Sequence, residues 1–135
     1  MKLLEKDVQR QIMDWFGWNK IFCYRQNTGG FKRDGHFYKF GSVGAPDIIA
    51  IIGGKYIGIE IKGANGGKQS ENQKKFQREL EAAGGEYLLV HSLDNTIKEI
   101  GKIIKKLKRN MYEKRKTKNR ILGKRRDRKI GQCFT

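Results

Sequence analysis

Apolar and polar positions follow two different periods along the chain, which distinguish expected helices from expected strands. Apolar residues recur every three or four positions, the spacing of amphipathic helices, in segments 3–16, 70–83 and 94–107. Short runs rich in β-branched and aromatic residues predict strands at 20–26, 47–52, 55–62 and 87–90. A polar and aromatic segment, 31–40, is expected to form a further strand or an ordered loop. This order predicts an α/β fold in which a mixed β-sheet is flanked by helices.

Two of the expected strands are joined by Gly53 and Gly54, and Gly-Gly is a favoured two-residue hairpin turn. Counting outwards from this turn puts Asp47 directly opposite Glu60. Lys62 shares the face of Glu60, because side chains alternate between the two faces of a strand. Directly opposed Cβ atoms are ~5 Å apart. The sequence therefore predicts that two carboxylates converge on one divalent cation beside an ammonium group.

The residues around Asp47, Glu60 and Lys62 are apolar on both faces of the two strands, which is typical of central strands in a covered sheet. In the plainer interpretation these are ionised residues at strand ends, and an exposed Glu–Lys pair is ordinary solvated surface. Two carboxylates near a buried sheet edge, however, repel each other unless a cation or a proton intervenes. We therefore interpret the three residues as a functional site.

The residue types in this site favour one class of chemistry. Carboxylate oxygens and backbone carbonyls suit Mg²⁺ or Mn²⁺, which prefer hard oxygen ligands. Such a cation lowers the pKa of water and offsets charge on phosphoryl oxygens, and a nearby lysine can orient the water or stabilise the transition state. No Ser/His/Asp or Cys/His arrangement competes in the sequence. The pattern indicates phosphodiester hydrolysis rather than acyl transfer.

The 135 residues carry a formal net charge of +16, and the excess lies at the C-terminal end. Residues 1–101 hold 15 Lys and Arg against 12 Asp and Glu, a net of +3, whereas residues 102–135 hold 15 against 2, a net of +13. We expect one domain, 1–107, followed by a basic tail, 108–135. The tail is too polar to offset its ordering entropy, so we expect it to be mobile alone and partly helical on a polyanion.

A basic excess of this size favours a polyanion through counterion release. Nucleic acid is the expected partner, in preference to an anionic membrane surface, and the tail predicts DNA binding that does not depend on base sequence. A solvated chain end and an RNA-binding arm are the alternative interpretations of the same segment.

Cysteine content and hydropathy exclude several other classes. Cys23 and Cys133 are too few and too far apart to indicate a disulfide framework or a zinc site. The sequence shows no secretory segment and no apolar run near the ~20 residues of a membrane span. We expect a soluble, intracellular protein with no membrane partner.

Pro46-Asp47, followed after 12 residues by Glu60-Ile61-Lys62, resembles the signature of the PD-(D/E)XK nuclease superfamily. Further segments narrow the resemblance: 44–47, 58–62, 70–76 and 82–85 together are similar to the VRR-NUC branch, particularly its stand-alone phage and prophage members. The resemblance covers residues 3–107. A lone PD…EXK pattern is short and tolerant, whereas the ordered set of segments is far more specific.

The resemblance implies a restriction-endonuclease-like core and a metal-dependent endodeoxyribonuclease that acts on branched, flap or Holliday-junction DNA. It also implies a homodimer, to which segment 31–40 is a candidate contributor, and a cytoplasmic location, in the host for a phage protein. By position, Asp47 and Glu60 are metal ligands and the Ile61 carbonyl is a further one. Lys62 is the catalytic lysine.

Two more residues match the branch outside the central signature. Gln73 matches a catalytic-site glutamine on the helix that follows the EXK strand, and Glu5 matches an acidic residue of the first helix that joins the metal shell. The alternative for Gln73 is a capping box with Ser70, and both roles can hold. The alternative for Glu5 is a solvated helix charge. Arg25 is either a contact for DNA phosphates or a surface residue.

Two other functions remain open at this point. The first is a non-catalytic nucleic-acid-binding protein that retains the nuclease fold, although a pure binder has no need to hold opposed carboxylates beside a polyanion. The second is a restriction-type enzyme with base-specific cutting, but so short a chain has no obvious recognition insertion.

Overall fold

The computed structural model describes residues 3–27, 29–63 and 67–133, with side chains described as far as residue 125. The chain forms helices and strands in the following order: α1 (Glu5–Trp18), β1 (Phe22–Arg25), β2 (Gly29–Arg33), β3 (His36–Phe40), β4 (Ile48–Ile52), β5 (Lys55–Ile61), α2 (Glu71–Ala82), β6 (Glu86–Val90) and α3 (Leu93–Cys133).

Four of the strands form one mixed sheet in the order β1-β4-β5-β6. The β1–β4 and β4–β5 pairs are antiparallel, and β5 pairs with β6 in parallel. The predicted hairpin register is confirmed, from Ile52 opposite Lys55 to Ile48 opposite Ile59. The two central strands are buried along most of their length, as expected for runs that are apolar on both faces.

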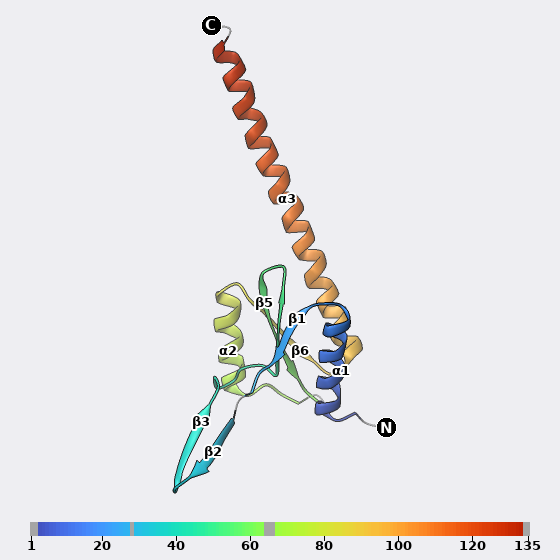
Figure 1. Cartoon of the computed structure of the whole chain (residues 1–135), viewed down its shortest axis with the longest axis vertical. Helices are drawn as coiled ribbons and strands as arrows, with labels where there is room; N and C mark the ends of the chain where they lie inside the picture. The colour runs from blue at the N-terminus through green and yellow to red at the C-terminus, as the bar shows by residue number, and fades with distance from the viewer. Residues whose placement is uncertain (1–2, 28, 64–66, 134–135) are drawn as a thin grey trace. The chain divides into compact units, whose positions relative to one another are not determined.

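Segment 31–40 forms neither a single strand nor a loop but most of a separate two-stranded hairpin, β2–β3. The chain turns at Asp34 and Gly35, which have φ angles of 49° and 75°. An Asp-Gly pair suits such a turn because both central residues adopt positive φ. Gly29 and Gly30 form the start of β2. Figure 1 shows this hairpin extending beyond the four-stranded sheet.

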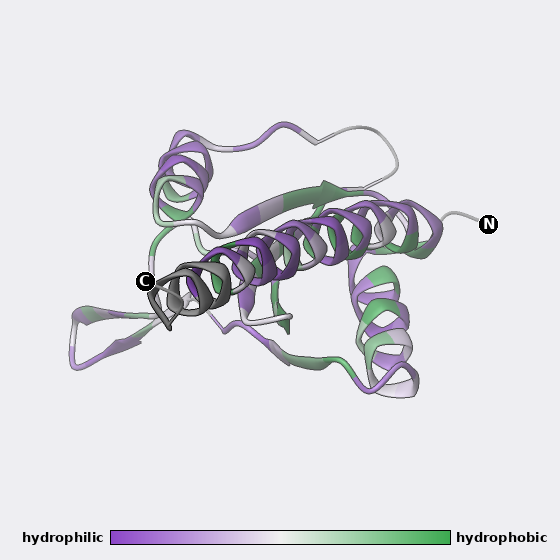
Figure 2. Ribbon diagram, turned by 90° about the horizontal axis from the view of Figure 1, so that it is seen from above, coloured by the Kyte–Doolittle hydropathy of each residue, from purple (hydrophilic) through white to green (hydrophobic). Residues whose placement is uncertain are grey.

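Helices α1 and α2 lie on opposite faces of the four-stranded sheet (Figures 1 and 2). On α1, the predicted stripe is confirmed by the buried residues Val8, Ile12 and Phe16, whereas Leu4 is exposed just before the helix begins. On the other face, Leu80 of α2 lies against Gly58, where a Cβ would be 3.4 Å from the leucine methyl carbon. The mixed sheet flanked by helices is therefore observed.

The third helix is longer than the sequence predicts. It begins at Leu93, one residue before the predicted segment 94–107. Ser92 Oγ accepts a 3.1 Å hydrogen bond from Asn95 N, as an N-cap residue does. It then continues to Cys133 without the expected change at residue 108. Low apolar content argues against burial but not against helix, because Lys and Arg have good helix propensity.

The chain divides into two compact units, 1–99 and 100–135, so the division lies within α3. The first unit contains all the strands and both shorter helices that the structure describes. The second consists of the basic remainder of α3. The predicted boundary at residue 107 was based on the change in charge, not on contacts within the structure. The separate function predicted for residues 108–135 stays a prediction. Among the described residues, no helix combines the length and apolar content needed to cross a membrane.

Candidate functional site

Asp47 lies immediately before β4, and its main chain and side chain are both held in place. Its carbonyl oxygen accepts a 2.8 Å hydrogen bond from the N–H of Gln26. Its carboxylate Oδ2 accepts a 2.7 Å hydrogen bond from the N–H of Ile61 in β5. The paired residues end at Ile48 and Ile59, so the direct cross-strand pair of Asp47 with Glu60 is not part of the ladder. The carboxylate instead satisfies a backbone donor of β5 that the ladder leaves available.

This hydrogen bond also places the Ile61 carbonyl. The N–H and C=O of one residue in an extended strand point to the same side. Because the Ile61 N–H points to Asp47, its carbonyl oxygen faces the same edge of β5. The structure thus brings the predicted backbone oxygen to the side on which the aspartate lies.

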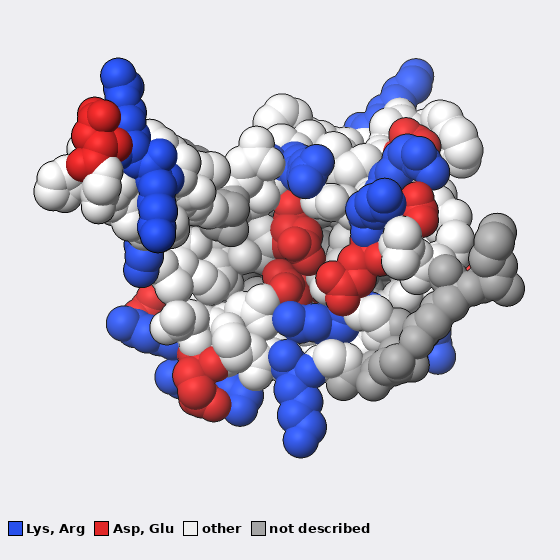
Figure 3. All heavy atoms as spheres, turned by 90° about the horizontal axis from the view of Figure 1, so that it is seen from below, with Lys and Arg blue, Asp and Glu red and all other residues white. Residues whose placement is uncertain are grey.

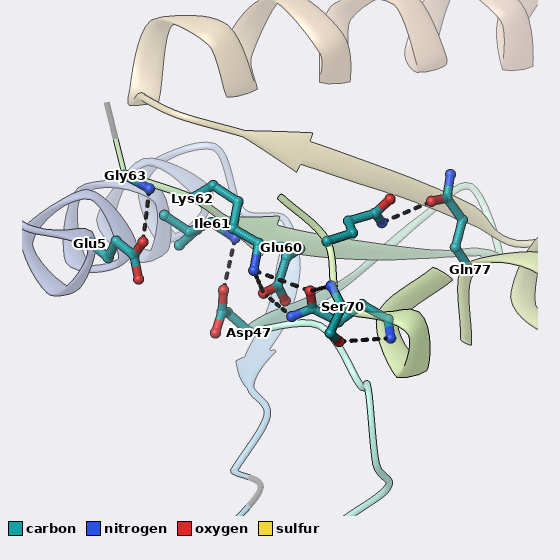
Figure 4. A network of polar contacts seen from close by, with 10 residues as sticks. Glu5, Asp47, Glu60, Ile61, Lys62, Gly63, Ser70 and Gln77 are labelled. Atoms are coloured by element: carbon teal, nitrogen blue, oxygen red, sulfur yellow. Dashed lines mark hydrogen bonds and ion pairs between the residues drawn. The ribbon is translucent and has the colours of Figure 1, made fainter. Parts of the chain in front are cut away.

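Glu60 and Lys62 point to the same side of the sheet, as the two-residue period predicts (Figure 4). Glu60 is 5% exposed, which is rare for a carboxylate without a role or a partner. The ammonium Nζ of Lys62 lies 3.3 Å from Glu60 Oε1. The EXK strand therefore presents a buried carboxylate with its own lysine in contact.

Gln73 forms the capping box and also contacts two of the predicted site residues, whereas its catalytic role stays a prediction. Its N–H donates to Ser70 Oγ at 3.2 Å and its Oε1 accepts from Ser70 N at 2.9 Å, which completes a capping box at the start of α2. Its side-chain Nε2 also donates to Glu60 Oε1 at 2.5 Å, and its Oε1 accepts from Lys62 Nζ at 3.1 Å. The helix start thereby fixes the glutamine that links the carboxylate to the lysine.

Burial and mutual repulsion shape the electrostatics of the two carboxylates. Burial and, to a smaller extent, the negative charge of Asp47 raise the pKa of Glu60 from its ordinary 4.5 to about 7, against the opposing effects of Lys62 and Gln73. Burial likewise raises the pKa of Asp47, against the hydrogen bond from Ile61 and the charges of Lys62 and Arg25. Both carboxylates therefore lie where a cation would relieve an electrostatic cost.

Glu5 reaches the same edge of the sheet from α1. Its Oε1 accepts a 2.8 Å hydrogen bond from the N–H of Gly63, just beyond β5 (Figure 4). Its negative charge contributes to the raised pKa of Asp47, so the two carboxylates lie in the same neighbourhood. Its membership of a metal shell stays a prediction.

Two glycines allow the close packing that holds these groups. Gly44 has a φ of 79°, and a Cβ there would lie 2.9 Å from Gln73 N and closer still to the carbonyl of Asn72. A Cβ at Gly58 would lie 2.7 Å from Cγ of Pro46. The loop before Asp47 thus packs directly on the first turn of α2 and on β5.

Other features near the site were not recognisable from local sequence patterns. Tyr87 of β6 shares a sheet face with Glu60, and burial, with the charges of Glu60 and Asp47, raises its pKa to about 12. Its segment is typical of any buried strand, so no signal marked it. Lys6, Arg10 and Arg25 line a pocket of about 380 Å³ beside α1. Of these, only Arg25 was a sequence candidate.

The oxygen atoms of the site fit a hard divalent cation. Hydrogen bonds occupy Oδ2 of Asp47 and Oε1 of Glu60, and neither Oδ1 nor Oε2 bonds to any residue that the structure describes. No three His, Cys, Asp or Glu side chains within the described ranges gather as a metal site. Mg²⁺ commonly uses one or two carboxylates and keeps several waters, so a pair of carboxylates with a backbone oxygen suits it.

The surrounding surface combines both signs of charge. Seen from below, acidic side chains gather near the centre of one face, with lysines and arginines around them (Figure 3). Chemically, the arrangement suits a polyanionic substrate held by cations over a pair of carboxylates. Comparison with known proteins adds no assignment, because no family model and no curated protein matches the chain.

Proposed function

We propose that this protein is a Mg²⁺- or Mn²⁺-dependent endodeoxyribonuclease of the PD-(D/E)XK type, in its VRR-NUC branch, with a restriction-endonuclease-like core. The observation that carries the proposal is the contact set of Glu60. This buried carboxylate touches Lys62 Nζ at 3.3 Å and Gln73 Nε2 at 2.5 Å. Asp47, anchored on the same strand through Ile61, raises the pKa of that carboxylate.

Asp47 and Glu60, with the Ile61 carbonyl, are the residues that would hold the cation, and Glu5 is the remaining candidate. When bound, Mg²⁺ offsets negative charge on the phosphoryl oxygens of the substrate. The fit rests on the donor set. Two carboxylate oxygens have no hydrogen bond from any described residue, and one backbone oxygen lies on the same edge of β5. These are the hard ligands that Mg²⁺ prefers.

The chain's own residues supply positioning and proton handling. A lysine ammonium has three N–H donors. Lys62 uses two of them, one on Glu60 Oε1 and one on Gln73 Oε1. Among the described residues nothing accepts from the third, so we assign it to a scissile phosphate oxygen or to orienting the attacking water. Gln73 holds the lysine and the carboxylate in one rigid network, because the capping box fixes its own backbone.

DNA is the proposed partner, and the basic half of α3 is its proposed sequence-independent contact. Lysines and arginines recur on the exposed surface of residues 108–125. Their charge favours phosphates without reading bases. Action on branched, flap or Holliday-junction DNA, a homodimer and a cytoplasmic location are the other parts of the proposal, and they rest on the resemblance.

A non-catalytic nucleic-acid binder explains the site less well. Holding Glu60 at 5% exposure beside Asp47 costs stability at neutral pH, since its pKa is raised to about 7. A protein that only binds phosphates gains nothing from a buried carboxylate and a half-buried one near a polyanion. An enzyme that needs a cation at that position gains a binding site for it.

The decisive experiment incubates the full chain with linear duplex, single strand, flap and four-way junction DNA, each with Mg²⁺, Mn²⁺ or EDTA. We expect cutting that requires the metal. Asp47→Asn and Lys62→Met should lower cutting at least 100-fold, the scale of losing electrostatic stabilisation of a transition state. A matched control is Glu71→Gln, whose side chain is 85% exposed on α2 and should leave cutting unchanged.

Three results would reject the proposal. If Asp47→Asn cuts DNA at the parent rate, the assignment of the active site is wrong. If cutting persists in EDTA, the proposed dependence on a divalent cation is wrong. Binding of DNA with no cutting of any substrate, under either metal, establishes the binder instead.

A further inference from the structure

The β2–β3 hairpin, here called the aromatic arm (residues 29–40), presents large aromatic side chains to solvent. All the residues of both strands are exposed. They include Phe31, Phe37, Tyr38 and Phe40, each between 48% and 57% exposed. A fold does not require four exposed rings in so short a hairpin. Such density on a surface indicates an interaction site.

Two glycines of β2 make room for two of the rings. A Cβ at Gly29 would lie 3.0 Å from Cζ of Phe40, and a Cβ at Gly30 would overlap the ring of Phe37. Both rings therefore lie over glycine backbone, and about half of each remains in solvent. Half-exposed aromatic rings held against the backbone are the platforms on which proteins stack unpaired bases.

An open pocket of about 350 Å³ lies where the arm joins the loop that leads to Asp47. Phe37, Lys39 and Phe40 line it from the arm, and residues 42–44 line it from the loop. Gly44, which also lines the pocket, packs on the backbone of Asn72 and Gln73. The pocket thus connects the aromatic rings with the loop that packs on the first turn of α2.

Both ends of the arm are tied to Asp47. The N–H of Gln26 donates to the Asp47 carbonyl before β2 begins, and only 7 positions separate Phe40 from Asp47. Seven residues span at most ~25 Å, which is the length of about seven stacked base pairs. A nucleotide bound by the arm would therefore lie within about seven nucleotides of the phosphate group placed at Asp47 and Glu60.

The net charge of the arm indicates what kind of partner it binds. Lys32, Arg33 and Lys39 stand against the single acid Asp34, so the arm is positively charged. This complements phosphates, whereas a second copy of the arm would bring like charges together. A contribution of the arm to the expected homodimer is thereby disfavoured. Cations interleaved with open rings match a nucleic-acid strand whose bases are available.

We propose that the aromatic arm binds an unpaired base of the substrate strand in this pocket, and that it directs the proposed nuclease to DNA that is opened next to the cut. The inference rests on the function proposed above. Bases inside an intact duplex are stacked on each other and cannot reach the rings. The substrate class is therefore a boundary between single and double strands, such as a flap or an open branch.

The test measures binding of the full chain in EDTA to fluorescein-labelled (dT)20 and to a duplex whose two ends are closed by loops too short to bind. Phe37→Leu should weaken binding to (dT)20 about tenfold, the lower part of the range for loss of one stacked base. Binding to the closed duplex should not change. Phe37→Trp keeps a ring and should keep the parent affinity. Phe37 lies outside the stacked Phe31–Tyr38 pair, so this change spares the pair that joins the two strands.

The matched control is Phe22→Leu, since Phe22 of β1 is 66% exposed but lies outside the arm. Parent-like (dT)20 binding by Phe37→Leu, or an equal loss on the closed duplex, overturns the inference. The inference is also overturned if the parent sediments as a dimer and Phe37→Leu sediments as a monomer. In that case the arm binds a second copy of the chain rather than DNA. Binding in EDTA is independent of cutting. If the parent cuts no DNA but Phe37→Leu still loses (dT)20 binding, the proposed role of the arm stands. Only the proposed nuclease function is then rejected.

Discussion

Oδ2 of Asp47 accepts a 2.7 Å hydrogen bond from the backbone N–H of Ile61, at the point where β4 and β5 cease to pair. The aspartate is therefore positioned by the strand that also carries Glu60 and Lys62. The three predicted site residues thus depend on one central strand rather than on separate loops. This arrangement keeps the carboxylates close even where their repulsion is unfavourable.

The stability of the metal-free protein should fall as pH rises through the titration of Glu60. Its pKa is about 7 in the folded protein against 4.5 ordinarily, so the folded state keeps a proton that the unfolded state releases. Stability is therefore lost between pH 4.5 and about 7, by about 3 kcal/mol at ~1.4 kcal/mol per pKa unit. Thermal unfolding in EDTA from pH 5 to 9 measures this.

Glu60→Gln isolates the effect from the other titrating groups. It keeps an oxygen that can accept from Gln73 and Lys62 but carries no charge. The variant should have a higher Tm than the parent at pH 8 and a similar one at pH 5. Glu71→Gln, on the exposed surface of α2, should follow the parent throughout. Parallel pH curves for the parent and Glu60→Gln would contradict the raised pKa.

Added Mg²⁺ should raise the Tm of the parent at pH 8, because a cation relieves the repulsion between Asp47 and Glu60. At ten times its Kd, a ligand that binds only the folded state adds about 1.4 kcal/mol. The shift should shrink at pH 5.5, where protons compete for Glu60, and vanish in Asp47→Asn. Asp14→Asn, an exposed carboxylate of α1, is the control.

The same titration decides the role of Glu5. Glu5→Gln retains an oxygen that can accept from the Gly63 N–H, so the contact between α1 and the end of β5 persists. If Glu5 joins the metal shell, the Mg²⁺-induced shift will be smaller than in the parent. A full parental shift assigns Glu5 to structure alone.

Gln73 and Ser70 should separate the capping role from the role at the site. Ser70→Ala and Gln73→Ala each break the capping box and should each lower stability by about 1 kcal/mol. Only Gln73→Ala removes the contacts to Glu60 and Lys62, so only it should lower kcat, by tenfold or more. Equal losses of kcat in single-turnover cutting would show that the glutamine acts only through the helix start.

Gly44→Ala should damage the site through the backbone. Its φ is 79°, and the added Cβ would collide with the carbonyl of Asn72 and press on Gln73 N. Gly54→Ala is a matched control, since Gly54 has a φ of 78° and no atom within 4 Å of the added Cβ. Both variants carry left-handed strain of about 1–2 kcal/mol, but only Gly44→Ala should displace α2 and lower kcat.

Local sequence rules predicted the parts of the site that depend on neighbouring residues. The Gly53-Gly54 turn fixes the β4–β5 register, and the two-residue period then puts Glu60 and Lys62 on one face. The Ser70–Gln73 spacing predicted the capping box. Each of these follows from geometry within a few residues along the chain, which is why they could be read without a structure.

Contacts between distant segments were beyond such rules. Glu5 and Gly63 are 58 residues apart, and nothing local indicates that a carboxylate of the first helix will cap the end of β5. The bond from Ile61 to Asp47 arises because the ladder stops one pair early. The length of α3 was missed for another reason. Apolar content predicts whether a segment is buried, whereas helix propensity decides whether an exposed segment forms a helix.

The basic helix should supply affinity without contributing to chemistry. Lys114, Lys116 and Lys118 are exposed on α3, so their replacement by Gln should leave the fold intact. For each of these lysines that neutralises a phosphate, the slope of log Kobs against log salt should fall by about 0.9 on duplex DNA. Replacement of the same three by Arg keeps the charge and should keep the slope. At saturating DNA, kcat should be the same in the parent and in both variants. A lower kcat in the Gln variant with an unchanged slope would place these lysines in catalysis rather than in binding.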